Sequence, residues 1–316
     1  MKKALTVLRN IILVVFGIII LWVLANQILK KVDEKKISQK GSYVTVKGKQ
    51  MDVYSTGEGD KTIVLMPGLG TTAPILDFEP LINRLAKDFH VVIAEPFGYG
   101  WSDLSDEDRS VQNIVEELRM ALKESGESGP YILMPHSVSG IYASWYADKY
   151  PDEVSAIAGI DCALPKQVDY FGGENPSVPF IAKAVNPLGL QRIACYISPS
   201  MFISDNQSGE YSDDNLSQQK LISCKVGYNK TMIDEMNMVE KNTEETFDIK
   251  FDSELPLLFF TRETKNAEDN KTREDFYKQY ITNTDRQKVI VLDTGHYMHW
   301  TKAEEIAEET KDFFYK

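Results

Sequence analysis

The sequence predicts an α/β fold, in which a mainly parallel sheet carries helices on both faces. Short β-rich apolar runs alternate with longer stretches whose apolar residues recur at helical spacing, which is typical of strands joined by crossover helices. The chain has 316 residues and 43% of them are hydrophobic, so it can bury a full core. These figures exclude a disordered chain, a collagen and a disulfide-stapled miniprotein.

The predicted elements follow a regular order up to the middle of the chain. A hairpin is expected over Tyr43–Tyr54. Strands are expected at Thr62–Met66, Val91–Ala94, Tyr131–Met134, Val154–Asp161, Pro256–Phe260 and Lys288–Leu292. Helices are expected at Phe78–Lys87, Ser110–Glu124, Val138–Tyr150 and Ala303–Phe314.

The interval 164–254 breaks this rhythm and is too long for a plain loop. We therefore expect it to be a largely helical cap inserted into the core. The expected organisation is a membrane anchor or signal segment (1–31), a linker (32–42), the first part of the core (43–163), the cap (164–254) and the second part of the core (255–316).

The N-terminal segment has the features of a membrane-spanning helix. A charge-free run from Asn10 to Leu29 lies between basic residues on both sides. Twenty helical residues extend about 30 Å, the thickness of the hydrocarbon core. We expect one uncleaved helix that makes few contacts with the body, so that the protein is a single-pass membrane protein with its catalytic domain outside the cytoplasm. The alternative is a signal peptide cleaved near Val23–Ala25, which releases a secreted protein.

Charge and cysteine content exclude two further classes. Residues 1–36 hold seven Lys/Arg and two acidic residues, whereas the rest of the chain holds 28 and 45. A body this acidic repels the phosphate backbone, so no nucleic-acid partner is expected. Cys162, Cys195 and Cys224 are widely spaced with no C-x-x-C pair, so no metal site is expected. Three packed thiols are expected, with a Cys195–Cys224 disulfide as the main alternative.

The segment Tyr131–Gly140 is the most informative for function. A buried strand runs directly into Ser137, and a helix starts near Val138. Such a tight turn lifts a serine hydroxyl above the sheet and directs the helix N-terminus at it. The compact residues Pro135 and Ser139 stand where a G-x-S-x-G turn has glycines. The alternative role for Ser137 is a structural helix cap.

Together with three other motifs, this segment resembles the α/β-hydrolase family from about Tyr43 to the C-terminus. Met66–Gly70 is similar to the family's His-Gly oxyanion loop, with Pro67 in place of His. Glu95–Asp103 is close to the family's Asp-x-x-Gly-x-Gly-x-Ser turn, and Leu292–His299 looks like its Gly-His segment before the last helix. The resemblance implies a serine hydrolase of the capped esterase, lipase or aminopeptidase-like branch.

A serine nucleophile requires a base and two oxyanion donors. His296 follows a strand end and is the expected base, with His299 as the alternative. His136 and His90 are expected to have structural roles. The resemblance implies that the backbone N–H groups of Leu69 and Val138 form the oxyanion hole.

The acid is where the sequence departs from the family pattern. Lys265 occupies the position after the cap where the family has its Asp. Asp161 ends an otherwise apolar strand, where an acid is costly to bury unless it is paired. Some family members take their acid from this strand, so Asp161 is expected to complete the triad, with Glu263 as the alternative.

The sequence thus predicts a serine hydrolase that cleaves a small ester, lipid or amide through a covalent acyl-serine. A non-catalytic ligand-binding protein on the same scaffold is the alternative. No cofactor is expected, because no phosphate-binding or dinucleotide-binding glycine motif follows the first strand. The expected partners are a small-molecule or lipid substrate and a membrane, and the oligomeric state is left open.

Overall fold

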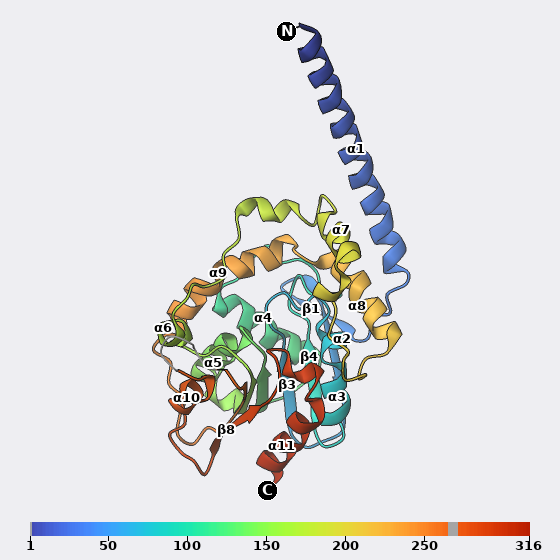
Figure 1. The fold of residues 1–316 in the computed structure, drawn as a ribbon. Coiled ribbons are helices and arrows are strands. Elements are labelled where there is room, and N and C mark those ends of the chain that lie inside the picture. Colours follow the sequence, from blue (N-terminus) through green and yellow to red (C-terminus); the bar gives the residue numbers. More distant parts are fainter. Residues whose placement is uncertain (1, 265–270) are drawn as a thin grey trace.

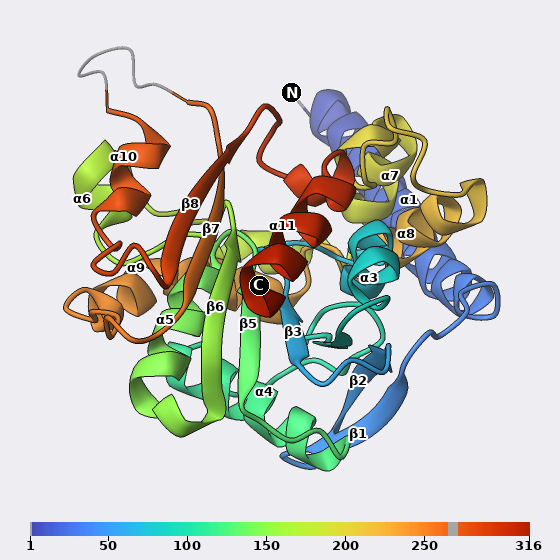
Figure 2. The same cartoon turned by 90° about the horizontal axis from the view of Figure 1, so that it is seen from below.

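A central sheet organises the protein, seen from two directions in Figures 1 and 2. The computed structural model describes residues 2–264 and 271–316, and eight strands of this part form one sheet in the order β1-β2-β4-β3-β5-β6-β7-β8. The strands are β1 (Ser42–Val46), β2 (Lys49–Thr56), β3 (Thr62–Met66), β4 (His90–Ala94), β5 (Tyr131–Pro135), β6 (Val154–Ile160), β7 (Leu257–Arg262) and β8 (Gln287–Leu292). Strand β2 is antiparallel to both of its neighbours, and all other pairs are parallel. This confirms the predicted mainly parallel sheet.

Helices cover both faces of the sheet (Figure 2). Helices α4 (Val111–Glu124), α5 (Ser139–Lys149) and α10 (Arg273–Lys278) pack on one face. Helices α3 (Glu79–Leu85) and α11 (Ala303–Tyr315) pack on the other. Between β6 and β7 lie α6 (Gln167–Phe171), α7 (Leu190–Ile197), α8 (Asp213–Val226) and α9 (Lys230–Thr246). The remaining short helices are α2 (Pro74–Asp77), η1 (Pro151–Glu153), η2 (Phe180–Ala184), η3 (Pro199–Met201) and η4 (Met298–Trp300).

Two-sided cover explains why the central strands are apolar at successive positions. In β3, Val64 and Met66 pack in the core cluster beneath α4 and α5, whereas Ile63 and Leu65 pack beneath α3 and α11. Successive side chains of a strand point to opposite faces, so a strand covered on both sides has no polar face.

The helix predicted at Phe78–Lys87 is present but shorter, and a second short helix that the sequence analysis did not predict precedes it. The stretch expected as Phe78–Lys87 contains α3, and α2 precedes it with Phe78 between them. Pro74 and Pro80 each lie in the first turn of their helix. Proline has no backbone N–H to donate and is tolerated only in a first turn, so two separate helix starts form.

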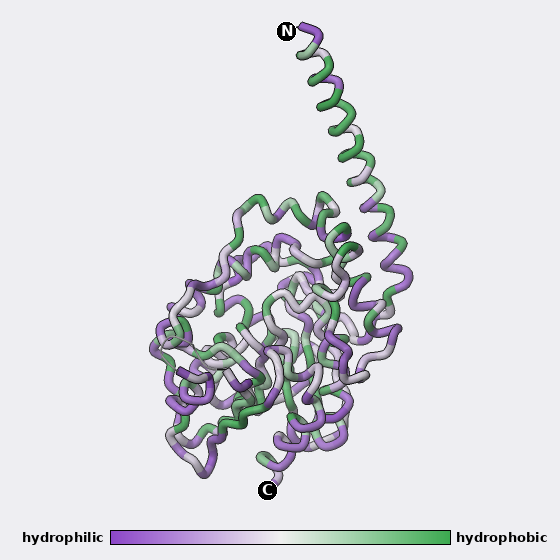
Figure 3. The backbone as a smooth tube through the Cα atoms, in the orientation of Figure 1, coloured by the Kyte–Doolittle hydropathy of each residue, from purple (hydrophilic) through white to green (hydrophobic). Residues whose placement is uncertain are grey.

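The N-terminal helix α1 (Lys2–Glu34) projects from the body (Figure 1), and its apolar length is visible in Figure 3. Among the described residues it is the one helix long and apolar enough to cross a membrane, and its most apolar window is unburied. The C-terminal part of α1 contacts the segment between β6 and β7, and this contact buries Asn26 and Asp33 of α1. This is more contact than the sequence indicated, and the first three residues of the expected linker 32–42 belong to the helix.

Candidate active site

Ser137 lies at the turn between the central strand β5 and helix α5. Its backbone is in the left-handed region at φ 53°, a conformation that side-chain-bearing residues rarely adopt. The turn is held by neighbouring groups, because the Ser139 hydroxyl donates to the Pro67 carbonyl at 2.5 Å. Ser139, which stands at the position of a family glycine, therefore links the turn to the loop after β3.

Two glycines allow the backbone to pack closely around this turn. A Cβ at Gly140 would lie 2.1 Å from the carbonyl oxygen of Ala163, and one at Gly68 would lie 2.8 Å from the Nδ1 of His136. Real side chains do not approach so closely, so both positions require glycine. The close-packing glycine of the helix is thus Gly140, one residue later than in a G-x-S-x-G turn.

His296 bridges Ser137 and Asp161. Its Nε2 lies 2.9 Å from the Ser137 Oγ, and its Nδ1 lies 2.6 Å from the Asp161 Oδ2. The three side chains come from the carboxyl ends of β5, β6 and β8, which meet at one edge of a parallel sheet. The arrangement matches the hydrogen-bonded geometry that general-base activation of a serine requires.

The Asp161 carboxylate is buried and also contacts two arginines. Arg262 Nε lies 2.9 Å from Oδ2, and Arg273 Nε lies 2.7 Å from Oδ1. Burial raises the pKa of Asp161, but the hydrogen bond from His296 and the charges of Arg273 and Arg262 outweigh it, and the pKa lies below its usual value. The carboxylate is therefore ionised at neutral pH and accepts the Nδ1–H of His296.

Sequence reasoning missed both arginines. Arg262 ends β7, which pairs in parallel with β6, so the ends of these strands had to lie together. That signal was available, since Asp161 directly follows β6. Arg273 comes from α10, a short helix after the undescribed residues 265–270, and no local pattern marks it.

The alternative site residues lie elsewhere. Glu263 is exposed, and Asp161, not Glu263, accepts from His296. Lys265 lies outside the described residues. His299 Nε2 lies 2.7 Å from Asp77 Oδ2, and its ring stacks on Phe78.

The two remaining histidines also have local partners. His136 is buried, and its Nε2 lies 3.2 Å from the carbonyl oxygen of His296. Burial, together with the nearby rings of His299 and His296, lowers the pKa of His136 well below its usual value, so this ring is neutral and donates to the loop that carries His296. His90 contacts Gly57 and Glu127 at the opposite edge of the sheet.

Two residues beside Ser137 have backbone amides that can serve as donors. Leu69 and Val138 both line the cavity at Ser137, and neither amide donates to an acceptor within the part of the chain that the structure describes. A hydrogen bond holds the loop that carries Leu69, because the Gly70 amide donates to the Tyr99 hydroxyl at 3.2 Å. The two free amides are suited to bind an oxyanion.

A buried acid connects this loop to α9. Glu235 of α9 accepts from the Tyr99 hydroxyl at 2.7 Å and from the Tyr142 hydroxyl at 3.0 Å. Burial raises the pKa of Glu235 despite the opposing charge of Arg109. The contact fixes α9 over the site.

The cavity at Ser137 has a volume of about 350 Å³ and is mostly apolar, with Ile141, Leu164, Phe171 and Val239 in its lining. Arg273 adds a cation to its wall. Its size lies within the range of small-molecule sites. No group of three metal-ligating side chains that could hold an ion occurs among residues 2–264 and 271–316.

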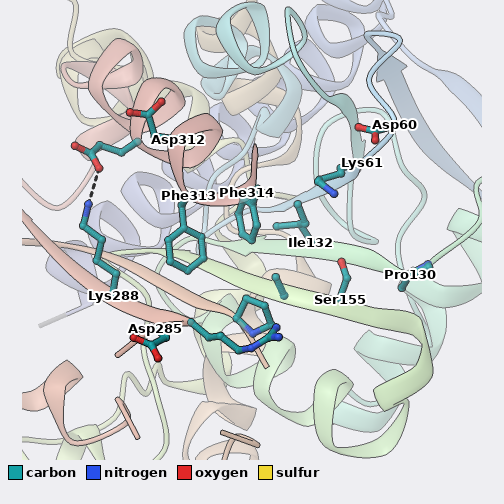
Figure 4. A pocket seen from close by; sticks show the side chains of 14 residues that line it. Asp60, Lys61, Pro130, Ile132, Ser155, Asp285, Lys288, Asp312, Phe313 and Phe314 are labelled. Atoms are coloured by element: carbon teal, nitrogen blue, oxygen red, sulfur yellow. Dashed lines mark hydrogen bonds and ion pairs between the residues drawn. The ribbon is translucent and has the colours of Figure 1, made fainter. Parts of the chain in front are cut away.

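A wider hollow of about 1120 Å³ lies away from these residues (Figure 4). Lys61, Pro130, Ser155 and Lys288 line it, at or next to the first residues of β3, β5, β6 and β8. It is therefore at the opposite edge of the sheet from Ser137, and in parallel α/β sheets ligands bind at the carboxyl edge.

Comparison with known proteins agrees with the fold. The family model described as alpha/beta hydrolase fold matches residues 61–185, which include Leu69, Ser137 and Asp161. The protein is an α/β-hydrolase-fold protein, as its motifs predicted.

Particular relatives are similar over part of the chain. The uncharacterized protein YbdG of Bacillus subtilis (strain 168) is 44% identical over 128 residues, which are 40% of this chain and 39% of that protein. Serine hydrolase BPHL of Homo sapiens is 35% identical over 119 residues, 35% of this chain and 39% of that protein. The chain thus matches about two fifths of the length of these curated relatives.

Solved structures are similar over most of the chain. The Cif epoxide hydrolase from Acinetobacter nosocomialis superposes with a TM-score of 0.68, covering 93% of this chain and 97% of that one at 16% sequence identity. At this identity the likeness establishes the shared fold alone.

Proposed function

We propose that the protein is a serine hydrolase that cleaves a small ester, lipid or amide through an acyl-Ser137 intermediate. The observation that carries the proposal is the hydrogen-bonded chain from Ser137 Oγ through His296 to Asp161. Ser137 would be the nucleophile, His296 the base and Asp161 the acid of a catalytic triad. A carboxylic ester is the favoured substrate class.

The proposed reaction has two steps, acylation of Ser137 and hydrolysis of the acyl-serine. The Ser137 Oγ bonds to the substrate carbonyl carbon while its proton moves to His296 Nε2, and the amides of Leu69 and Val138 stabilise the negative oxygen. The carbonyl re-forms as the leaving group departs with the proton from His296. Water then attacks the acyl ester by the same route, which frees the acid product and restores the Ser137 hydroxyl.

A serine at this turn favours acyl transfer over epoxide opening. If the Ser137 oxygen opened an epoxide, it would form an ether, and the water and imidazole that cleave an ester do not cleave an ether at neutral pH. Acyl transfer is therefore the reaction after which water can regenerate the free Ser137 hydroxyl for a further cycle. The name of the human relative, a serine hydrolase, agrees with this choice.

Hydrolysis of p-nitrophenyl acetate, butyrate, octanoate and laurate tests the proposal. The wild-type protein is expected to hydrolyse at least one ester, and Ser137→Ala is expected to remove the activity. The matched control is Ser144→Ala, which removes a buried hydroxyl of the nearby helix α5 that donates to the Gly140 carbonyl. Equal activity of wild type and Ser137→Ala would contradict the proposal.

We further propose that α1 is an uncleaved anchor that holds the catalytic domain outside the cytoplasm. The apolar window of α1, which is unburied, supports the membrane anchor. Extraction of membranes at alkaline pH is expected to leave the full-length protein in the pellet. Protease added to cells whose outer layer has been opened, but whose cytoplasmic membrane is intact, is expected to digest the body of the protein. Release of a shortened chain into the medium would support signal cleavage instead.

A further inference from the structure

Helix α7 has the reverse polarity of a surface helix. Its inward face carries Gln191 and Arg192, which are buried. Its outward face carries Ile193 and Ile197, and Ile197 is 76% exposed. A surface helix in water directs its apolar side chains to the core and its charges outward. This arrangement is the one that an apolar surrounding would require.

The short helices before and after α7 in the chain also expose large apolar side chains. Phe180 of η2 is 79% exposed, and Met201 of η3 is 75% exposed. We name this surface the cap apolar face. It consists of Phe180, Ile181, Leu190, Ile193, Ile197 and Met201. Soluble monomers rarely expose several large apolar side chains on neighbouring helices unless these side chains bind something.

The cap apolar face lies at the end of the molecule from which α1 projects (Figure 1), and Figure 3 shows hydrophobic stretches on both. The two are fixed together by a buried polar junction. Arg192 donates to Asn26 Oδ1 at 2.8 Å and to Asp33 Oδ2 at 2.5 Å. Lys30 donates to Asn186 Oδ1 at 2.6 Å. Because Arg192 and Asp33 form a buried pair of opposite charge, the junction fixes α7 against α1.

The junction reaches into the charge-free run of α1. Gly189, the residue before α7, lies so close to α1 that a Cβ there would be 2.9 Å from the indole Nε1 of Trp22. Trp22 precedes Leu29, the last residue of the run, by seven residues, or about 10 Å of helix. If the run occupies the hydrocarbon core, the start of α7 lies at the boundary of the bilayer and not in bulk water.

We propose that the cap apolar face is seated in the bilayer that α1 spans, at the boundary between headgroups and acyl chains. The inference rests on the proposed membrane anchor. Tyr196, beside this face, carries the Lys220 ammonium 4.2 Å from its ring centroid, and such pairs of an aromatic ring and a lysine are typical of the interfacial layer. Residues 172–176, which line the cavity at Ser137, lead directly to η2. An amphiphilic substrate dissolved in the bilayer would then approach the site along this segment.

Depth measurements on the full chain test the proposal. Single nitroxide labels are attached at Ile197→Cys, at Val15→Cys in α1 and at Val291→Cys, an exposed apolar position on β8 that serves as the matched aqueous control. Cys162, Cys195 and Cys224 are buried free thiols and are expected to remain unlabelled. The protein is reconstituted in vesicles of phosphatidylcholine and phosphatidylglycerol, and label relaxation by oxygen is compared with relaxation by a water-soluble nickel chelate.

The expected result is a lipid-like ratio of oxygen to nickel accessibility at Ile197 and Val15, with an aqueous ratio at Val291. An aqueous ratio at Ile197 together with a lipid-like ratio at Val15 would overturn the proposal and leave the anchor intact. Aqueous ratios at both sites would overturn the anchor as well. Protection of Ile197 from both reagents with spin–spin broadening would assign the face to a second copy of the chain, which also overturns the proposal.

Discussion

The carboxylate of Asp161 accepts from His296 Nδ1 at 2.6 Å while it also pairs with Arg262 and Arg273. A buried carboxylate with two arginines and one imidazole is held in a single orientation. Its backbone is in the left-handed region at φ 37°, which directs the side chain above the sheet edge. The acid therefore needs no reorganisation when His296 takes a proton.

Replacing Asp161 and Glu263 one at a time should show which of these two carboxylates acts as the acid of the triad. Asp161→Asn is expected to lower kcat by about four orders of magnitude, because the amide favours the wrong tautomer of His296. Glu263→Gln is expected to leave kcat nearly unchanged, because Glu263 is exposed and His296 Nδ1 pairs with Asp161. Ester hydrolysis by the two variants, with circular dichroism to check folding, measures this. The reverse pattern would assign the acid to Glu263.

Replacing His296 should mainly affect activity, whereas replacing His299 should mainly affect stability. His299→Gln is expected to lower the free energy of unfolding by about 1–3 kcal/mol, because it disturbs the buried contact with Asp77, and to leave kcat of the folded protein unchanged. His296→Gln is expected to abolish hydrolysis with a smaller loss of stability. Urea unfolding and ester hydrolysis are measured on both variants. A loss of kcat in His299→Gln at full folding would make His299 the base.

Arg273 should control the acid limb of activity. Arg273→Met removes a cation that lowers the pKa of Asp161, so this pKa rises and the carboxylate is protonated at a higher pH. The acid limb of kcat/KM is therefore expected to move to higher pH. Arg286→Met, at an exposed arginine paired with Glu254, is the matched control. An acid limb that stays in place in Arg273→Met would show that the arginine does not act through Asp161.

Glu95 should make the fold less stable as the pH rises. This buried carboxyl accepts from the amides of Trp101 and Ile75, and burial raises its pKa from 4.5 to about 8. The folded state therefore binds more protons than the unfolded state between these values, and stability falls with rising pH through this window. Glu95→Gln is expected to flatten that part of the profile, measured by urea midpoints from pH 5 to pH 8 in detergent. Glu254→Gln is the exposed control, and an equal slope in wild type and Glu95→Gln would contradict the assignment.

The sheet was predictable because its signal is local. Each parallel strand is an apolar run bounded by turn residues, and the observed ends differ from the predicted ones by at most two residues. Ser137 and His296 were predictable as neighbours because each follows a strand of the same parallel sheet, whose carboxyl ends meet. Asp161 follows by the same logic, since an acid directly after an apolar strand needs a partner.

Other features depend on contacts between distant segments, which local patterns do not contain. The pairing of Arg273 with Asp161 requires α10 to fold back over the sheet edge. The junction of Arg192 with Asn26 and Asp33 joins residues more than 150 positions apart, and nothing near Arg192 in the sequence marks it. The exposure of the apolar side of α7 could not be predicted either, because an eight-residue helix with apolar residues on one side is expected to bury that side.

Covalent labelling with a fluorophosphonate probe tests the central claim most directly, because this reagent bonds to a serine oxygen only when a base activates it. The account predicts one phosphonyl adduct per chain by intact mass, mapped to the peptide that contains Ser137. It also predicts that the adduct is lost in Ser137→Ala, strongly reduced in His296→Gln and retained in Ser144→Ala. Absence of an adduct at neutral pH in the folded wild-type protein, or an adduct on another residue that persists in Ser137→Ala, would contradict the account.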